Sequence, residues 1–566
     1  MVRPLHIHPW RDPAPLRQAA TLLLLRDGAG GLEVLMTRRS ERASFVPGAY
    51  VFPGGTVEAG DASTHGLARL RPQQSASQAT AALAALRECY EELGLLLGYD
   101  AHHRPLCAAD VATLQRDAPL LPQCEARGWT LAVDALFELA RWTTDRDLAK
   151  RFEVPFLVAH APHDQQPVAD EREQFEPVWI SPTDALARHA QGTFFMIFPT
   201  VRTLQFLQRY GDAQAVLDAC AQAHAPFWDS CPRAGWRSGE QARFMEHELE
   251  FAELALVCPD GQIRHTLDWQ HEQPVPLLRH VQRLTAPNPG RMTGPGTNSY
   301  LVGEAATGYV VIDPGPADSE HLQRLLDATQ GDIRAIVCTH SHPDHAPGAR
   351  PLQAMVRASG RPAPAVLGLP SGAQSRPDSV FTPDRTLQEC EHLTLAAPAS
   401  QADSTHTLEV WACPGHASNH LVLRLCEDGL LFSGDHVLSG STTVIDPPDG
   451  DMHAYLQALT TLRQRCAEHA VAFILPAHGH VLGGSVEAVQ GELARLHRHR
   501  LQREAKVLRA VQVNPKAGLD GWLPEVYDDV PTGLWPVARR SLLAHALRLQ
   551  TLGQWPPRAS AVTPRS

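Results

Sequence analysis

The chain lacks any apolar run close to the roughly 18 residues that a membrane-spanning helix requires, which excludes such a helix. The first 18 residues contain Arg, Asp and Pro but no hydrophobic core, so we expect no signal peptide among them. None of the eleven cysteines belongs to a CxxC pair, and this scattered set favours free thiols in a reducing compartment. Together these absences predict a cytoplasmic protein with no membrane partner.

The sequence also lacks an internal repeat, so its 566 residues predict about three or four different domains. Apolar residues make up 43% of the chain, enough for buried cores and too many for wholesale disorder. We expect α/β domains at residues 14–215 and 276–490, a linker with a small β unit at 216–275, and a helical domain at 491–556. Within the linker, Val257-Cys258-Pro259-Asp260-Gly261-Gln262 predicts a hairpin turn.

The formal charge of −12 is unevenly distributed along the chain. Residues 491–566 hold twelve Arg and Lys against six Asp and Glu, a net charge of +6, so the preceding residues carry −18. A basic tail on an acidic body is typical of a protein that binds an anionic partner such as nucleic acid. An ordinary solvated helical face accounts for the same composition equally well.

A cluster of metal-ligand side chains follows a short apolar run. Residues 333–338 predict a buried strand, and His340-Ser341-His342-Pro343-Asp344-His345 comes directly after it. Neutral imidazoles suit zinc, and a loop at the end of a strand can aim several side chains at one point. A single histidine is more often a core or surface residue, but four ligand-type side chains within six positions predict a transition-metal site.

This hexapeptide resembles the HxHxDH signature of the metallo-β-lactamase fold. Three further motifs of that family occur in order, each after an expected strand: Cys413-Pro414-Gly415-His416, Leu431-Phe432-Ser433-Gly434-Asp435 and Pro476-Ala477-His478-Gly479-His480. The resemblance implies seven ligands for two zinc, manganese or iron ions: His340, His342 and His416 for the first, Asp344, His345 and His478 for the second, and Asp435 as the bridge.

Two such cations lower the pKa of a shared water and clamp the attacked centre. The resemblance makes Asp344 a catalytic residue as well, because it would orient this water or relay its proton. We expect the three other histidines near these motifs, His420, His436 and His480, to lie behind the ligands or at the surface.

Stretches before the cluster resemble one branch of this fold, the lactamase-β-like-2 group. They are Asn288-Pro289-Gly290, Gly296-Thr297-Asn298-Ser299-Tyr300-Leu301-Val302-Gly303 and Ile312-Asp313-Pro314-Gly315. Residues 491–556 are similar to the winged-helix-like extension of that group. Its members cut single-stranded RNA, which implies RNA as a partner. Thioesterases of the glyoxalase II type share the metal motifs, so a thioester is the alternative substrate.

Three acidic residues of the N-terminal domain are spaced for one face of a helix. In Arg87-Glu88-Cys89-Tyr90-Glu91-Glu92-Leu93-Gly94-Leu95, Glu88 precedes Glu91 and Glu92 by three and four positions. Carboxylates packed this closely repel unless a cation gathers them, and their hard oxygens suit Mg²⁺ and phosphate chemistry. A solvated face with an Arg87–Glu91 ion pair is the other interpretation of this spacing.

Together with Phe52-Pro53-Gly54-Gly55-Thr56-Val57-Glu58-Ala59-Gly60-Asp61, this stretch resembles the Nudix box. The sequence departs from the box in having Asp61 in place of Glu and in placing residues 62–86, 25 residues, where the box has seven. We expect the insert to loop out of the turn, as in a subgroup that includes coenzyme A diphosphatases. The resemblance implies Glu88, Glu91 and Glu92 as catalytic ligands of Mg²⁺ or Mn²⁺, with Glu173 as a further carboxylate.

Leu35-Met36-Thr37-Arg38-Arg39-Ser40 is similar to the coenzyme A signature of that subgroup, although Ser44 stands where an Arg is expected. A nucleoside diphosphate derivative or coenzyme A is therefore the implied small-molecule partner.

The fold class that these resemblances imply is α/β multidomain: an αβα Nudix domain, an αββα metallo-β-lactamase sandwich and a small C-terminal winged-helix-like domain. We expect an enzyme with two hydrolytic centres, a binuclear metal hydrolase of a phosphodiester or related ester and a Mg-dependent Nudix diphosphate hydrolase. One alternative is a glyoxalase II-like thioesterase whose Nudix domain handles the coenzyme A product. Another is a metallohydrolase regulated by a Nudix domain that binds a nucleotide without cleaving it.

Overall fold

The computed structural model describes residues 5–43, 45–397, 405–557 and 559–563, and its chain divides into two compact units. The N-terminal unit comprises Arg11–Ala234 with Asp260–Gln262, and the remaining described residues form the C-terminal unit. Among the described residues, no helix has the length and apolar character needed to cross a membrane. All eleven cysteines are free thiols, as the absence of a CxxC pattern predicts.

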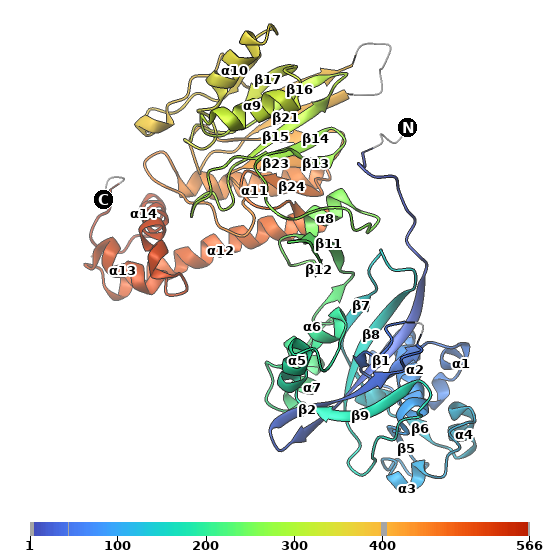
Figure 1. The fold of residues 1–566 in the computed structure, drawn as a ribbon. Helices are drawn as coiled ribbons and strands as arrows, with labels where there is room; N and C mark the ends of the chain where they lie inside the picture. The colour runs from blue at the N-terminus through green and yellow to red at the C-terminus, as the bar shows by residue number, and fades with distance from the viewer. Residues whose placement is uncertain (1–4, 44, 398–404, 558, 564–566) are drawn as a thin grey trace. The chain divides into compact units, whose positions relative to one another are not determined.

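A mixed sheet of eight strands forms the middle of the N-terminal unit (Figure 1). Its strand order is β10-β7-β8-β1-β2-β3, with β4 also beside β1 and β9 beside β2. The central strand β1 pairs in parallel with β8 and antiparallel with β2 and β4. The strands are β1 (Leu16–Gly28), β2 (Gly31–Arg39), β3 (Tyr50–Val51), β4 (Gly54–Thr56), β7 (Phe137–Thr143), β8 (Arg151–His160), β9 (Gln174–Ile180) and β10 (Asp229–Ser230), and β5 (Gly98–Tyr99) pairs separately with β6 (Thr130–Leu131).

Helices cover both faces of this sheet, so β1 is apolar on both sides. Leu22 and Leu24 join the core beneath α2, while Leu23 and Leu25 point to the other face and are equally buried. Figure 1 shows α2 on one side of the sheet and α5 to α7 on the other, which is the expected αβα arrangement. The helices are α1 (Ala59–Ser63), α2 (Ala76–Leu93), α3 (Ala108–Val111), α4 (Leu120–Ala126), α5 (Pro182–Ala190), α6 (Phe198–Leu207) and α7 (Ala213–Gln222).

The insert in the Nudix-like motif does not loop out of the turn as expected. Its second half forms the first turns of α2, because Ser75 caps that helix by accepting a hydrogen bond from the Gln78 backbone N–H at 3.3 Å. The helix ends at Gly94, which has a left-handed φ of 68° that suits glycine. The extended α2 packs on β1 and β4 and holds its acidic residues beside the glycine-rich turn.

Two stacked sheets form the centre of the C-terminal unit, with seven strands in the first and six in the second. In each sheet the strands lie side by side in the order in which they occur in the sequence. The first sheet contains β13 (Val275–Leu278), β14 (Val281–Thr285), β15 (Asn298–Glu304), β16 (Gly308–Ile312), β17 (Ile333–Val337), β18 (Ala365–Gly368) and β19 (Arg385–Thr386). The second contains β20 (His392–Ala396), β21 (Thr405–Ala412), β22 (Leu421–Leu425), β23 (Leu430–Gly434), β24 (Phe473–Pro476) and β25 (Leu482–Gly483).

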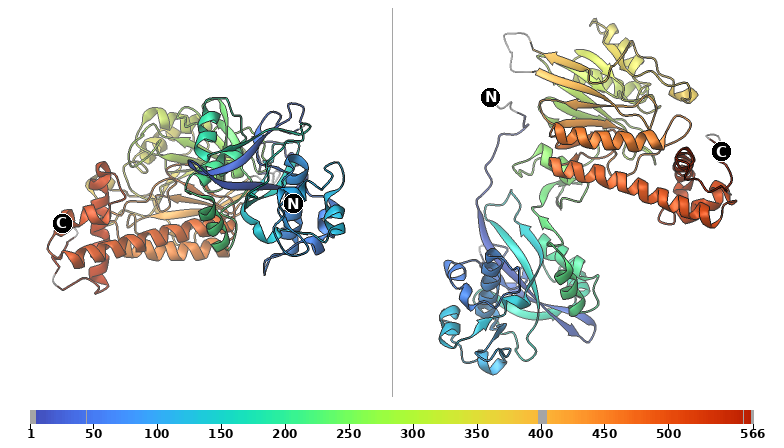
Figure 2. Two further views of the ribbon diagram at one scale, coloured as in Figure 1. Left: turned by 90° about the horizontal axis from the view of Figure 1, so that it is seen from below. Right: turned by 180° about the vertical axis from the view of Figure 1, so that it is seen from behind.

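Along each strand, successive side chains point alternately into the core between the two sheets and into the core beneath the helices outside. Val310 and Ile312 point into the core between the sheets, whereas Val311 points outward to α9 (Ser319–Ala328) and α10 (Ala349–Ala358). On the second sheet Phe432 points inward and Leu431 outward, toward α11 (Met452–Glu468) and α12 (Val486–Val513). The result is the expected αββα sandwich, whose second helical layer is plain in Figure 2.

The tail consists of α12, α13 (Gly518–Val526) and α14 (Trp535–Thr551), which enclose a small core around Trp522. The boundary that we expected at residue 491 falls inside α12. No strand occurs among the described residues after Gly483, so the tail is helical there and the expected winged-helix-like domain is not confirmed.

The expected linker at residues 216–275 is divided between the two units. Helix α7 and strand β10 belong to the N-terminal unit, and α8 (Phe251–Val257) packs in the C-terminal unit. A hairpin is present, but it joins β11 (Arg233–Arg237) to β12 (Glu240–Phe244). The hairpin turn predicted at residues 257–262 is wrong, because the residues before it form α8, whose end is marked by the hydrogen bond from the Cys258 N–H to the Leu254 carbonyl.

Candidate functional site

The candidate metal ligands all lie in loops that leave the carboxyl ends of strands, one in the first sheet and three in the second. His340, His342, Asp344 and His345 follow β17, His416 follows β21, Asp435 follows β23 and His478 follows β24. Strand β23 runs parallel to β24, so their loops emerge at the same edge of the second sheet. At Gly415, whose φ is 135°, a Cβ would lie 2.4 Å from the backbone nitrogen of Tyr455, so α11 can approach the His416 loop only because that residue is glycine.

Three imidazoles meet at the first candidate metal position. Nδ1 of His342 lies 3.0 Å from Nε2 of His340 and 2.9 Å from Nε2 of His416. These three nitrogen atoms form one of the donor groups compact enough to hold a metal ion. Three ring nitrogens converging on one point are the donor set that zinc prefers.

The second candidate position has one carboxylate and two imidazoles. Oδ2 of Asp344 lies 3.3 Å from Nε2 of His345 and 3.2 Å from Nε2 of His478. Asp435 reaches both positions: its Oδ1 lies 3.3 Å from His478 Nε2 and its Oδ2 lies 3.5 Å from His416 Nε2. The sequence-predicted ligands are therefore brought together as two groups of three with Asp435 between them.

Hydrogen bonds on the far side of three of the rings fix their orientation. His416 donates from Nδ1 to the Val444 carbonyl at 2.8 Å, and His478 donates from Nδ1 to the Gly296 carbonyl at 3.2 Å. Nδ1 of His345 donates to Asp313, whose importance the sequence motif alone did not reveal. Each anchored ring directs its other nitrogen to the metal position.

The electrostatics of the site fit bound cations. Burial lowers the pKa of His340 well below its usual range and that of His342 to about 3, so both imidazoles are neutral and offer a lone pair. Burial also opposes the charge on His478, but Asp435 and Asp344 outweigh it and raise that pKa to about 10. His345 Nε2 and Asp435 Oδ1 lie 3.5 Å apart, both buried without a hydrogen-bond partner, and a cation between them would satisfy both.

The three other histidines near the motifs are all buried rather than at the surface. His420 accepts a hydrogen bond from the Asp435 backbone N–H at 3.1 Å, and His436 lies against Tyr455 with 4.6 Å between ring centroids. His480 donates from Nδ1 to Glu253 at 3.0 Å. Glu253 is fully buried and also accepts a hydrogen bond from Arg283 at 2.6 Å. This ion pair fixes α8 to the C-terminal unit, and the prediction of a linker at these residues did not include it.

The acidic residues of α2 surround one buried guanidinium. Arg87 binds Asp61 through Nε at 3.0 Å and Nη2 at 3.1 Å, while its Nη1 lies 3.1 Å from Glu88 Oε1 and 2.9 Å from Glu91 Oε2. The predicted Arg87–Glu91 pair therefore exists, but Arg87 is 5% exposed and does not lie on a solvated face. Asp61 acts as the anchor of Arg87.

Glu92 lies deeper than its two neighbours. Its Oε1 accepts from Gln174 at 2.7 Å and its Oε2 from the Gly54 N–H at 3.0 Å. Burial raises the pKa of Glu92 to about 8, and burial raises that of Glu88 to about 7 against the opposing effect of Arg87. Burial penalises the charged form of both carboxyl groups, and a bound Mg²⁺ would offset that penalty.

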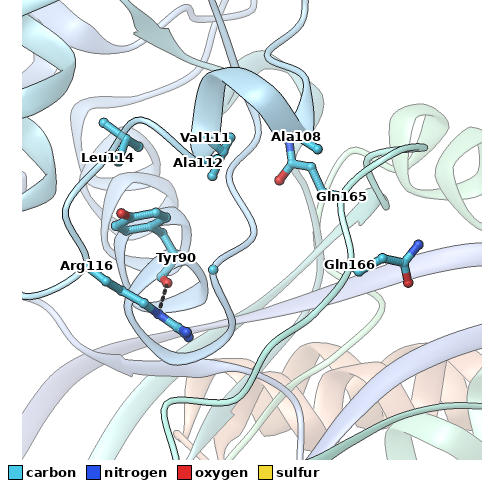
Figure 3. Close-up of a pocket in the computed structure, with 9 residues that line it drawn as sticks. Tyr90, Ala108, Val111, Ala112, Leu114, Arg116, Gln165 and Gln166 are labelled. Atoms are coloured by element: carbon cyan, nitrogen blue, oxygen red, sulfur yellow. Dashed lines mark hydrogen bonds between the residues drawn. The ribbon is translucent and has the colours of Figure 1, made fainter.

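A cavity of about 820 Å³ brings the predicted Nudix residues together, with Glu88, Glu91, Glu92 and Glu173 all in its lining. Among the described residues, the compact three-donor groups all lie in the C-terminal unit, so these carboxylates are not gathered as tightly as the histidines. A second hollow of about 260 Å³ lies beside the end of α2 (Figure 3). Arg116 lines both and donates from Nε to the Tyr90 carbonyl at 3.3 Å.

The stretch that resembles the coenzyme A signature is occupied by contacts within the protein. Arg38 forms a two-pronged ion pair with Glu176 at 2.8 and 3.1 Å and a further one with Glu41 at 2.9 Å. Ser44 lies outside the described residues.

Comparison with known proteins agrees with this geometry. A model of the metallo-beta-lactamase superfamily matches residues 292–478, and a NUDIX domain model matches residues 15–108. The beta-lactamase-like protein 2 homologue of Drosophila melanogaster is 28% identical over 285 residues, 49% of this chain and 90% of that protein. An atrochrysone carboxyl ACP thioesterase of Aspergillus novofumigatus is 26% identical over 250 residues, 43% of this chain and 66% of that protein.

Among solved structures, a NUDIX hydrolase from Alicyclobacillus acidocaldarius is 29% identical and covers 36% of this chain and 96% of that one, with a TM-score of 0.33. The fold and the two family matches define the class of protein as a multidomain hydrolase. The chain joins a NUDIX domain to a metallo-beta-lactamase domain, both from families of metal-binding enzymes.

Proposed function

We propose that the C-terminal unit is a two-metal hydrolase of acyl thioesters and that the NUDIX unit hydrolyses the diphosphate of the thiol product. The observation that carries the first half is the placement of Asp435, which has one oxygen toward each group of three ligands. Zinc, manganese and iron all suit this set of imidazoles and carboxylates. When bound, two such ions would lower the pKa of a water between them and polarise the attacked carbonyl.

The residues of the chain have distinct tasks in this proposal. His340, His342 and His416 hold the first ion, and His345, His478 and Asp344 hold the second, with Asp435 shared. The Asp344 side chain is 25% exposed, more than that of Asp435, so it is the carboxylate placed to exchange a proton with solvent or the leaving thiol. The Thr297 hydroxyl donates to Asp344 Oδ2 at 3.3 Å and restrains it.

The thioester class is supported by the printed name of one relative and by the fusion itself. The atrochrysone carboxyl ACP thioesterase matches the half of the chain that carries the metal motifs. Hydrolysis of an acyl thioester of coenzyme A releases an acid and a thiol that contains a diphosphate. Addition of water across that diphosphate bond gives two monophosphates, which is a reaction of the NUDIX type.

In the NUDIX unit, Glu88, Glu91 and Glu92 would hold Mg²⁺ or Mn²⁺ against the diphosphate, with Glu173 on the same cavity. Arg87 keeps Glu88 and Glu91 side by side through Nη1.

A phosphodiester in single-stranded RNA is the second candidate for the C-terminal unit. Arg498 and Arg509 are both exposed and lie eleven positions apart on α12, which places them on one side of the helix. Six other cations of the tail are already in ion pairs with carboxylates, so the positive charge free for RNA is smaller than the net charge suggests. The pairs are Arg495–Glu492, Arg503–Asp529, Lys506–Asp528, Arg539–Asp520, Arg540–Asp446 and Arg548–Glu504.

The test is a substrate panel on the full chain loaded with zinc and supplied with Mg²⁺. Short acyl thioesters of coenzyme A should release free thiol, measured with a chromogenic disulfide, and Asp435→Asn should abolish the release. Mass spectrometry should then detect 4′-phosphopantetheine and adenosine 3′,5′-bisphosphate from coenzyme A, and Glu88→Gln should abolish them. Cutting of RNA without thiol release would favour the second candidate, and binding of coenzyme A without cleavage would make the NUDIX unit a sensor.

A further inference from the structure

The segment at residues 443–446 lies between the candidate metal ligands and the helical tail. On its inner side, the Thr443 hydroxyl donates to the Asp435 carbonyl at 2.6 Å, and the Val444 carbonyl accepts from His416 Nδ1 at 2.8 Å. The first contact joins the segment to the backbone of Asp435, and the second joins it to the His416 ring at the first metal position. The position of the segment therefore sets the orientation of the His416 ring.

On its outer side, the same segment is held by the tail. Arg500 of α12 donates to the Thr443 carbonyl. Ser541 of α14 accepts from the Ile445 backbone N–H at 3.4 Å, and Arg540 of α14 pairs with Asp446 Oδ2 at 3.5 Å. The segment therefore contacts the ligand loops through Thr443 and Val444 and contacts the tail through Thr443, Ile445 and Asp446.

Arg500 is an unusual residue for a helix that would only contact RNA. It is 3% exposed, and no carboxylate pairs with its guanidinium among the described residues. Its guanidinium lies 5.4 Å from the Tyr455 ring centroid, and the Tyr455 hydroxyl donates to the His436 carbonyl at 2.9 Å. Burying a cation without a carboxylate partner costs free energy. The hydrogen bond from Arg500 to the Thr443 carbonyl is the contact that would offset this cost.

We propose that Arg500 is a positioning residue for the first metal ion, acting through the Thr443 and Val444 backbone on the His416 ring. The inference rests on the proposed two-metal function. It makes the tail an integral part of the hydrolase domain, because α12 and α14 complete the support of the first metal position. Loss of the Arg500 contact would let the Val444 carbonyl move, and the His416 ring would no longer direct Nε2 at His340 and His342.

The test compares Arg500→Gln with Arg503→Gln in the full chain. Arg503 is also buried on α12, at 6% exposure, but it binds Asp529 and the Val526 carbonyl inside the tail and does not contact residues 443–446. Zinc affinity and stoichiometry are measured by competition with a chelator dye. We expect Arg500→Gln to weaken one of the two ions about 10- to 100-fold and to leave the other unchanged. Arg503→Gln should bind both ions as the wild type does, and Arg500→Lys should be intermediate.

The outcomes separate this inference from the proposed function. If the wild-type chain binds fewer than two ions, the two-metal function fails whatever the variants do. If the wild type binds two ions and Arg500→Gln binds both within about twofold of its affinities, the positioning role is overturned. Should Arg500→Gln not fold, Ser541→Ala makes the comparison at Ile445, where it removes a contact between the tail and the segment and leaves Arg500 in place. A selective weakening of one ion then supports the role, and unchanged binding overturns it.

Discussion

Asp313 accepts a hydrogen bond from Nδ1 of His345 at 2.9 Å. The same carboxylate accepts from the Thr339 backbone N–H and hydroxyl, both at 2.7 Å. It thereby fixes the tautomer of His345 with the proton on Nδ1 and directs the Nε2 lone pair toward Asp344 and Asp435. Asp313 follows β16 with a φ of 50°, a left-handed conformation that aspartate tolerates better than most residues.

We expect Asp313→Asn to weaken the second metal ion about 10- to 100-fold while the first stays bound. An amide has one acceptor oxygen instead of two, so it cannot serve His345 Nδ1 and both Thr339 donors. Chelator competition on the zinc-loaded chain measures the effect, with Asp332→Asn as a control because Asp332 pairs only with surface arginines. Two unchanged affinities would refute this role.

Asp435→Asn should reduce the binding of both ions, because Asp435 Oδ1 and Oδ2 face different ligand groups. The amide keeps one oxygen donor but loses the negative charge that two cations share. Elemental analysis after dialysis at a fixed free zinc concentration should find fewer than one ion per chain. A variant that retains two ions would show that the bridging assignment is wrong.

The proximity of the candidate ligands was predictable because the signal for it is local. Each motif follows a strand, and the family resemblance implied the grouping. The structure brings His340, His416 and Asp435 close together, and their role as metal ligands stays a prediction. The supports of the ligands were not predictable in this way. Arg500 and Asp435 are 65 positions apart, and only packing of α12 on the second sheet relates them.

The NUDIX insert shows a different limit. Its Ser- and Gln-rich composition is compatible with a loop, yet Ser75 and Gln78 form a reciprocal cap that extends α2. The hairpin predicted at residues 257–262 is wrong for a similar reason. Pro259, Asp260 and Gly261 do form a turn, but it ends α8 rather than joining two strands. Turn residues indicate a change of direction and do not identify the elements on either side.

The stability of the NUDIX unit without Mg²⁺ should fall as the pH rises from about 5 to 8. Burial raises the pKa of Glu92 to about 8 and that of Glu88 to about 7, above their ordinary value of 4.5. A raised folded-state pKa means that the folded state holds the protons more tightly. The contribution is therefore complete below 4.5 and is lost as the pH passes through 7 and 8, with a slope of roughly 1.4 kcal/mol per pH unit for each proton.

Urea unfolding of the full chain, followed in the presence of a Mg²⁺ chelator, measures this loss. Adding Mg²⁺ should restore stability mainly at the higher pH, where both carboxylates are charged. Glu92→Gln should flatten the pH dependence, whereas Glu58→Gln, at an exposed residue on the same cavity, should not. A profile that is flat in the wild type would contradict the raised pKa values.

The two hydrolytic centres should be separable by single substitutions. Glu88→Gln removes one anionic ligand from α2 and should eliminate Mg²⁺-dependent diphosphate cleavage while leaving thioester cleavage within about twofold of the wild type. His342→Ala should do the reverse, because His342 contributes Nδ1 to the first metal position. Both rates are measured on the same preparation of each variant. A variant that loses both activities while it remains folded would mean that the two sites depend on each other.

RNA binding by the tail, if it occurs, should depend on two exposed arginines rather than on the whole net charge. Arg498 and Arg509 lie on one side of α12, and their charges are not used by the ion pairs that occupy most other cations of the tail. Each phosphate contact on a single strand releases counterions, so affinity falls with salt with a slope of roughly −0.7 per contact on logarithmic axes. Replacing both arginines by glutamine should reduce the slope by about 1.4.

The matched control is Arg495→Gln with Arg539→Gln, which removes the same charge from residues that pair with Glu492 and Asp520. Fluorescence anisotropy of a labelled single strand at several salt concentrations gives the slope for each variant. Replacing the paired arginines should change the slope less, because their carboxylate partners already compete with phosphate. Equal effects of the two double variants would indicate a diffuse electrostatic attraction without a defined contact surface. No binding by the wild type even at low salt would remove RNA from consideration, and the thioester would then remain as the substrate class of the metal site.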